Sequence, residues 1–173
     1  QFSEAAALGD ALQLASQAME QVTFQSQHDA LTRLPNRAMF REFAERQLRL
    51  AHRNAHGLAV IAIDLDHFKA VNDLQGHAAG DEVLVAAARR IEQAVRSSDM
   101  AARFGGDEFV VLLSETDPAT AIQTAHRIVD ALNQPYTTTS CPVTGSAGVA
   151  LYPQDGETLD ALSHAADGAL YAA

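Results

Sequence analysis

Cysteine and basic residues are scarce in this chain of 173 residues, and long apolar runs are missing. The single cysteine, Cys141, excludes an internal disulfide and fits a reducing compartment. We therefore expect a cytoplasmic domain, or the cytoplasmic part of a larger, membrane-attached protein. No apolar run approaches the ~20 residues of a membrane helix. Only 12 Lys and Arg stand against 22 Asp and Glu, without a basic stripe, which argues against nucleic acid as a partner.

The apolar periodicity predicts helices that alternate with strands. We expect helices over 3–27, 37–53, 66–75, 80–96 and 118–133 and from about 158, strands over 58–65 and 146–151, and a β-hairpin over 100–113. This order favours an α/β fold (an α+β sandwich) with a ferredoxin-like central sheet, one β-hairpin and flanking helices. The length fits one domain over 28–173 that follows an N-terminal helix over 1–27.

The N-terminal helix carries apolar residues at alternating spacings of three and four. This heptad seam consists of Ala5, Leu8, Leu12, Ala15, Met19 and Val22. Such a seam is typical of a coiled coil, here a signalling linker, although three heptads only just reach the usual length. The alternative is a helix packed on its own domain. Pro35 and Asn36 then predict the end of this segment and the N-cap of the next helix.

The most informative run is Arg103-Phe-Gly-Gly-Asp-Glu-Phe109. Gly105 and Gly106 lie between two apolar segments and predict a tight hairpin turn, because glycine adopts positive φ without steric penalty. Their missing side chains also let a sugar or phosphate approach the backbone. Asp107 and Glu108 repel each other unless a cation lies between them, which indicates a divalent metal. The alternative is an acidic, solvated turn.

A second acidic cluster follows the predicted central strand over 58–65. Alternation puts Asp64 and Asp66 on the same face, where they offer two oxygen ligands for Mg²⁺. Phe68 and Lys69 then begin a helical turn whose free N–H groups can cradle phosphates. The alternative for Asp64 is a carboxylate that caps the next helix.

Short polar residues further along match the hydrogen-bonding groups of a guanine. The Asp81 carboxylate can accept from its N1–H and N2–H₂ groups, and the Asn72 amide can meet O6 or N7. The alternative is an Asn in a turn and an Asp in the first turn of a helix.

Taken together, these residues resemble the GGDEF family of diguanylate cyclases, which condense two GTP molecules into cyclic di-GMP. The resemblance covers about residues 28–171 and depends on five blocks in order. These blocks are Asp29-Ala-Leu-Thr-Arg-Leu-Pro-Asn-Arg37; Asp64-Leu-Asp-His-Phe-Lys69 with Asn72-Asp73; Gly76-His77 with Gly80-Asp81; Arg103-Phe-Gly-Gly-Asp-Glu-Phe109; and Ser146-Ala-Gly148 with Ala166-Asp167 and Ala169-Leu-Tyr171. The resemblance implies a nucleotide-cyclase-like sheet.

The resemblance also implies roles for individual residues. Two Mg²⁺ (or Mn²⁺) ions per active site would be held by Asp64, the Leu65 carbonyl, Asp107 and Glu108. Asp107 would accept the 3′-hydroxyl proton, and Glu108 would support the metal pair. The residues implied to bind GTP are Asn72 and Asp81 for guanine, Phe68 and Lys69 for the phosphates, Gly105 and Gly106 for ribose and α-phosphate, and His77 beside the base.

A regulatory site is implied before the hairpin. Arg96 and Asp99 match the family's inhibitory Arg-x-x-Asp site for cyclic di-GMP, where the guanidinium and carboxylate meet guanine or phosphate. The alternative is ordinary helix-end chemistry. The implied partners are GTP, a second copy in a homodimer and an upstream sensor domain, and a phosphodiesterase domain follows in many such proteins.

The sequence departs from the family pattern after Tyr171. In the family a lysine, often with an arginine, shortly follows the Ala-Leu-Tyr block and binds the terminal phosphates. Here Ala172-Ala173 follows Tyr171, which we interpret as truncation.

The competing functions are an inactive GGDEF domain that binds GTP or cyclic di-GMP as a regulatory module, and a cyclase that makes cyclic AMP. The intact acidic positions argue against the first, and the guanine-matching residues argue against the second.

Overall fold

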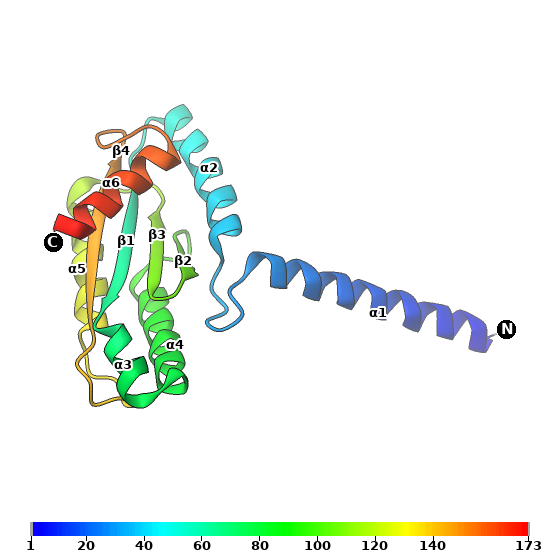
Figure 1. Ribbon diagram of the computed structural model, residues 1–173. Helices are drawn as coiled ribbons and strands as arrows, with labels where there is room; N and C mark the ends of the chain where they lie inside the picture. The colour runs from blue at the N-terminus through cyan, green and yellow to red at the C-terminus, as the bar shows by residue number, and fades with distance from the viewer. Residues whose placement is uncertain (1, 173) are drawn as a thin grey trace.

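Figure 1 shows the computed structural model of the chain, which describes residues 2–172. A four-stranded sheet is covered by helices on both faces, and one long helix projects from this body. The helices are α1 (Phe2–Gln27), α2 (Arg37–Asn54), α3 (Phe68–Gln75), α4 (His77–Ala94), α5 (Pro118–Leu132) and α6 (Leu159–Ala172). The strands are β1 (Leu58–Asp66), β2 (Met100–Gly105), β3 (Glu108–Leu113) and β4 (Thr144–Tyr152).

The sheet has the order β2-β3-β1-β4, and every neighbouring pair is antiparallel. The helices α3 and α4 connect β1 to β2, the hairpin joins β2 to β3, and α5 connects β3 to β4. This βαββαβ order is the ferredoxin-like arrangement, so the predicted fold class is confirmed. The register places Asp64 of β1 opposite Glu108 of β3 on one side and opposite Ser146 of β4 on the other.

The central strand β1 separates two hydrophobic cores, because its side chains alternate between the faces of the sheet. Ala59, Ile61 and Ile63 pack in the core beneath α3, α4 and α5. Leu58 and Val60 pack in the core beneath α2 and α6. Truncating a fully buried side chain such as Ile61 to Ala would destabilise the fold by about 2–5 kcal/mol. The same alternation carries Asp64 and Asp66 onto the face covered by α2 and α6.

The helix α1 stands away from the rest of the chain (Figure 1), and all side chains from residue 3 to residue 23 are exposed. Leu8 and Leu12 of the heptad seam are each 63% exposed, and Met19 is 71% exposed. A helix packed on its own domain is therefore wrong, and the coiled coil stays a prediction. Among the described residues, no helix is both long and apolar enough to cross a bilayer.

A junction loop (residues 28–36) joins α1 to α2 and is closed by hydrogen bonds. The Asn36 side chain donates to the Ser26 carbonyl, and the Asn36 N–H donates to the Gln27 carbonyl, both at 2.8 Å. The Asn36 carboxamide oxygen also accepts from the Met39 N–H at 3.1 Å, so the predicted N-cap of α2 is confirmed. The end of α1 and the start of α2 are thus tied to one residue.

Two local predictions need correction. The helix α4 begins at His77, not at Gly80, and ends at Ala94. Gly76 has a φ of +88° and separates α3 from α4, which lets the second helix begin three residues earlier. Asp81 therefore lies in the second turn of α4, and the alternative of a first-turn Asp does not hold.

The hairpin turn is shifted by one residue from the prediction. Gly105 still belongs to β2 and pairs with Glu108, after a bulge between Arg103 and Gly105. The turn itself therefore consists of Gly106 and Asp107. Gly105 and Gly106 have φ values of +131° and +51°, so the predicted need for positive φ is confirmed.

Candidate active site

Three carboxylates come from the end of β1 and from the hairpin. Asp64 and Glu108 face each other in the register of β1 and β3. The Leu65 N–H donates to the Asp107 carbonyl at 3.4 Å, so the hairpin turn contacts the end of β1. The structure thus brings together the two acidic clusters that lie more than forty residues apart in the sequence.

The electrostatics of this cluster favour a cation. Burial raises the pKa of Asp64, and the neighbouring carboxylates of Asp107 and Glu108 raise it further, to about 6. One Asp64 oxygen, Oδ1, is buried and has no hydrogen-bond partner. A buried carboxylate oxygen without a donor is costly unless a cation or a proton compensates it. The site therefore fits a bound cation.

Asp66 differs from Asp64, although both lie on the same face as predicted. The Ser146 hydroxyl donates to both Asp66 oxygens at 2.9 and 2.8 Å, and the Thr144 hydroxyl donates at 2.9 Å. These hydroxyls satisfy the Asp66 carboxylate and hold β1 and β4 together at their ends. Asp64 is thus the strand-end carboxylate that is free to ligate.

The donor set is compatible with Mg²⁺ even though it is small. Within residues 3–171, no three His, Cys, Asp or Glu side chains converge into a preformed metal cage. Mg²⁺ requires only one or two protein carboxylates and completes its coordination with water and substrate phosphate. The unpartnered oxygen of Asp64 and the adjacent acidic turn meet that requirement.

The predicted guanine-binding residues lie at the contact between α3 and α4. A Cβ placed on Gly80 would stand 1.8 Å from the Asn72 Oδ1 atom, so the Asn72 side chain lies directly over Gly80. Asp81 follows next on α4 and is exposed, as is His77 at the start of that helix. Gly80 is thus the residue that lets the Asn72 amide approach α4 beside Asp81.

The predicted phosphate-binding residues begin α3. His67 precedes this helix with a φ of +66° and makes no side-chain cap, so its imidazole accepts from neither the Phe68 nor the Lys69 N–H group. Phe68 is buried, whereas Lys69 is exposed. Phe68 therefore offers a ligand only its backbone N–H group, while Lys69 also offers a charge.

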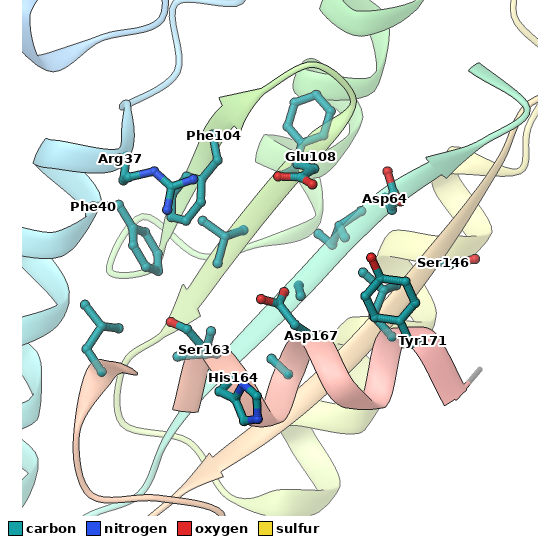
Figure 2. Close-up of a pocket in the computed structure, with 18 of the residues that line it drawn as sticks. Arg37, Phe40, Asp64, Phe104, Glu108, Ser146, Ser163, His164, Asp167 and Tyr171 are labelled. Atoms are coloured by element: carbon teal, nitrogen blue, oxygen red, sulfur yellow. The ribbon is translucent and has the colours of Figure 1, made fainter. Parts of the chain in front are cut away.

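A cavity of about 620 Å³ opens between α2, α6 and the sheet, and it was not predicted from the sequence. Figure 2 shows Asp64 and Glu108 on neighbouring strands, with Asp167 and Tyr171 reaching toward them from α6. Beside the cavity, α6 packs closely on β4, where a Cβ on Gly148 would stand 2.2 Å from the Ala166 carbonyl oxygen. Gly148 was the sequence signal for this close contact, whereas the cavity itself had none.

The predicted inhibitory pair is engaged in the turn between α4 and β2. The Arg96 guanidinium donates to Asp99 at 3.0 and 3.2 Å and also donates to the Ser114 carbonyl. Asp99 further accepts from the Arg96 and Ser114 N–H groups, and its side chain is only 2% exposed. Arg96 is 53% exposed, so only the guanidinium of this pair faces solvent.

Arg103 is a site residue that sequence reasoning missed. Its guanidinium lies between the junction loop and the hairpin turn, and it bonds to both. The available signal was a charged residue at the end of an otherwise apolar strand, directly before the two glycines.

The fold and the acidic site together define a ferredoxin-like domain of the nucleotide-cyclase kind. A family model described as "Diguanylate cyclase, GGDEF domain" matches residues 26–173. The chain therefore belongs to the GGDEF family, and the resemblance stated from the sequence is confirmed.

Curated relatives from Pseudomonas aeruginosa place the chain within longer proteins. Diguanylate cyclase TpbB is 46% identical over 155 residues, which cover 86% of this chain and 35% of TpbB. The bifunctional diguanylate cyclase/cyclic di-GMP phosphodiesterase MucR is 44% identical over 146 residues, which cover 83% of this chain and 21% of MucR. The chain thus spans about a fifth to a third of these relatives.

Solved structures agree with this assignment. The GGDEF domain of TpbB from P. aeruginosa is 45% identical with a TM-score of 0.81, and the match covers 84% of this chain and 87% of that one. The coiled coil and GGDEF domain of DgcB from Caulobacter crescentus, in complex with c-di-GMP, is 27% identical with a TM-score of 0.84. That match covers 98% of this chain and 92% of that one.

Proposed function

We propose that this domain is a diguanylate cyclase that condenses two GTP molecules into cyclic di-GMP and two pyrophosphates. The observation that carries the proposal is the unpartnered oxygen of Asp64, which lies at the end of β1 beside the acidic residues of the hairpin. The names of the relatives TpbB and MucR point to the same reaction.

The reaction requires a 3′-hydroxyl and an α-phosphate to meet in line. A bond forms between the 3′-oxygen and the α-phosphorus, the bond to the β-phosphate oxygen breaks, and the hydroxyl proton leaves. Asp107 lies in the hairpin turn, half-exposed, where its carboxylate can accept that proton. Two Mg²⁺ ions, held by Asp64, the Leu65 carbonyl, Asp107 and Glu108, would supply positive charge to the phosphate.

The remaining site residues hold GTP. Asn72 and Asp81 meet the guanine edge, with His77 beside it at the start of α4. The N–H groups of Phe68 and Lys69 face the phosphates at the start of α3, where the helix dipole favours negative charge. Gly105 and Gly106 leave the hairpin backbone bare, since a Cβ on either would meet no atom within 4 Å. Ribose and α-phosphate therefore have room against the turn.

Two domains must face each other, because each domain holds one GTP and the 3′-hydroxyl of each GTP attacks the α-phosphate of the other. The heptad seam of α1 is solvent-exposed and supplies the surface for a parallel coiled-coil homodimer. We place this dimer in the cytoplasm. The DgcB structure, which includes a coiled coil, matches α1 together with the domain. An upstream sensor would act through this helix, and exposed Arg96 would receive cyclic di-GMP as a product inhibitor.

The experiment that tests the proposal replaces Asp107 by Asn. Steady-state turnover of GTP with Mg²⁺ should fall at least ~10²-fold, because the variant lacks both a metal charge and the proton acceptor. Asp130→Asn, which neutralises an exposed carboxylate on α5, is the matched control and should keep turnover. Near-full turnover in Asp107→Asn would refute the mechanism. GTP binding without turnover in the wild-type protein would instead favour a regulatory module.

A further inference from the structure

One guanidinium connects the junction loop to the turn of the hairpin. Arg103 Nη1 donates to both carboxylate oxygens of Asp29, at 2.9 and 3.0 Å. On its other side, Nε and Nη2 donate to the Gly106 carbonyl at 3.1 and 2.8 Å. The Arg103 side chain is only 13% exposed and that of Asp29 is 18% exposed, so solvent screens this ion pair weakly.

The Asp29 end of this connection is rigid. The Thr32 N–H and hydroxyl both donate to Asp29 at 2.8 Å, and the Asp29 N–H donates to the Leu34 carbonyl at 2.7 Å. The Arg103 N–H also donates to the Pro35 carbonyl at 3.1 Å. Burial raises the pKa of Asp29, but the hydrogen bonds from Thr32 and Arg103 outweigh it, so the pKa lies below its ordinary value. Asp29 is therefore a charged, fixed anchor.

The hairpin end, by contrast, has little packing of its own. A Cβ placed on Gly105 or Gly106 would meet no atom within 4 Å, so no element packs against the Cβ side of either glycine. The bond from the Leu65 N–H to the Asp107 carbonyl is long, at 3.4 Å. The bonds from Arg103 to Gly106 are shorter and charge-assisted, and they hold the residue directly before Asp107.

We propose that Arg103 is a positioning residue that fixes the hairpin turn, and that Asp29 of the junction loop holds Arg103 in place for this task. The effect of Arg103 on turnover rests on the proposed cyclase function. Arg103 touches neither reacting atom. It sets where Asp107 stands, and a displacement of about 1 Å at a reacting group can lower a rate about 10²-fold.

The planar fork of arginine makes the proposal specific. One edge of the guanidinium meets Asp29 and another meets Gly106, which a single ammonium cannot reproduce. Arg103→Lys keeps the positive charge beside Asp29 but cannot hold both partners. Asp29→Asn keeps an acceptor for the Thr32 N–H but removes the charge that orients Arg103. Both variants should therefore loosen the turn without unfolding the domain.

Two measurements on the same proteins test this inference. Amide hydrogen exchange at residues 105–108 should become about 10-fold faster in Arg103→Lys and Asp29→Asn. With GTP and Mg²⁺, kcat should fall about 10–100-fold, with a much smaller rise in KM, because guanine is proposed to bind at α3 and α4 and only ribose and the α-phosphate lie against the turn. Arg53→Ala, which removes an exposed guanidinium from the last turn of α2, is the control and should change neither quantity.

The outcomes separate positioning from a purely structural role. Unchanged exchange at 105–108 in both variants overturns the proposal, even if the melting temperature falls. Faster exchange with unchanged kcat also overturns it, because the turn would then not need to be fixed. Exchange is measured without substrate, so a wild-type protein that fails to condense GTP refutes the proposed function but leaves the exchange result to decide whether Arg103 fixes the turn.

Discussion

Replacing Asp64 by Asn should make the metal-free protein more stable at neutral pH while it abolishes metal binding. The pKa of Asp64 is raised to about 6 from its ordinary 3.8, first by burial and then by Asp107 and Glu108. The folded state therefore binds the proton more tightly than the unfolded chain does. This contribution to stability is fully present below about pH 4 and is lost as the pH rises through about 6.

The size of the expected gain in stability follows from the pKa shift of Asp64. A shift of about two pKa units corresponds to about 3 kcal/mol, and partial solvent exposure reduces this to about 1–2 kcal/mol. For a domain of this size, that difference moves the melting temperature by about 2–8 °C. The Asn side chain is neutral at every pH, as protonated Asp64 is. The variant should therefore melt higher than wild type at pH 7 in EDTA and equally at pH 4.

Thermal denaturation followed by circular dichroism measures this difference. Added Mg²⁺ should raise the melting temperature of wild type at pH 7 but not that of Asp64→Asn, and the rise should shrink at pH 5, where a proton competes. Asp66→Asn is the matched control, because its carboxylate already accepts from Thr144 and Ser146 and should give no stability gain. A difference between Asp64→Asn and wild type that does not vary with pH would refute this electrostatic account.

Three further predictions concern the other parts of the site. Gly80→Ala should raise the KM for GTP more than that for ATP, since its Cβ displaces the Asn72 amide; equal effects on both nucleotides would remove Asn72 from the base site. Arg96→Ala should relieve non-competitive inhibition by cyclic di-GMP with GTP turnover preserved, and equal product affinity by calorimetry would rule the site out. Leu12→Glu should lower the dimer fraction in analytical ultracentrifugation together with activity, whereas an unchanged fraction would exclude the seam.

Much of the fold was predictable from the spacing of the apolar residues and from the residues that cap or end helices. The apolar run over 58–65 predicted a strand buried on both faces, and β1 is the central strand of the sheet. Asn36 was predicted to cap α2 and does so. The start of α4 was placed three residues late, because the conformation of Gly76 depends on how α3 and α4 meet. Periodicity carries no information about such a contact.

The candidate site was predictable only in part, because some of its chemistry depends on partners distant in sequence. The chain pattern placed Asp64 and Asp66 on one face, but it could not show that Ser146 satisfies only the second. Likewise, the motif around Arg103 predicts a turn from its glycines and a metal site from its carboxylates, but it assigns no partner to the arginine. Its partner Asp29 lies 74 residues earlier, and only the fold brings the two together.

The central claim is that this domain forms a cyclic dinucleotide from GTP. The most direct test incubates the protein with GTP and Mg²⁺, identifies the products by chromatography and mass spectrometry, and quantifies the pyrophosphate. The account predicts cyclic di-GMP with two pyrophosphates released for each product molecule. A cyclic mononucleotide as product, or GTP recovered unchanged beside a bound nucleotide, would contradict it.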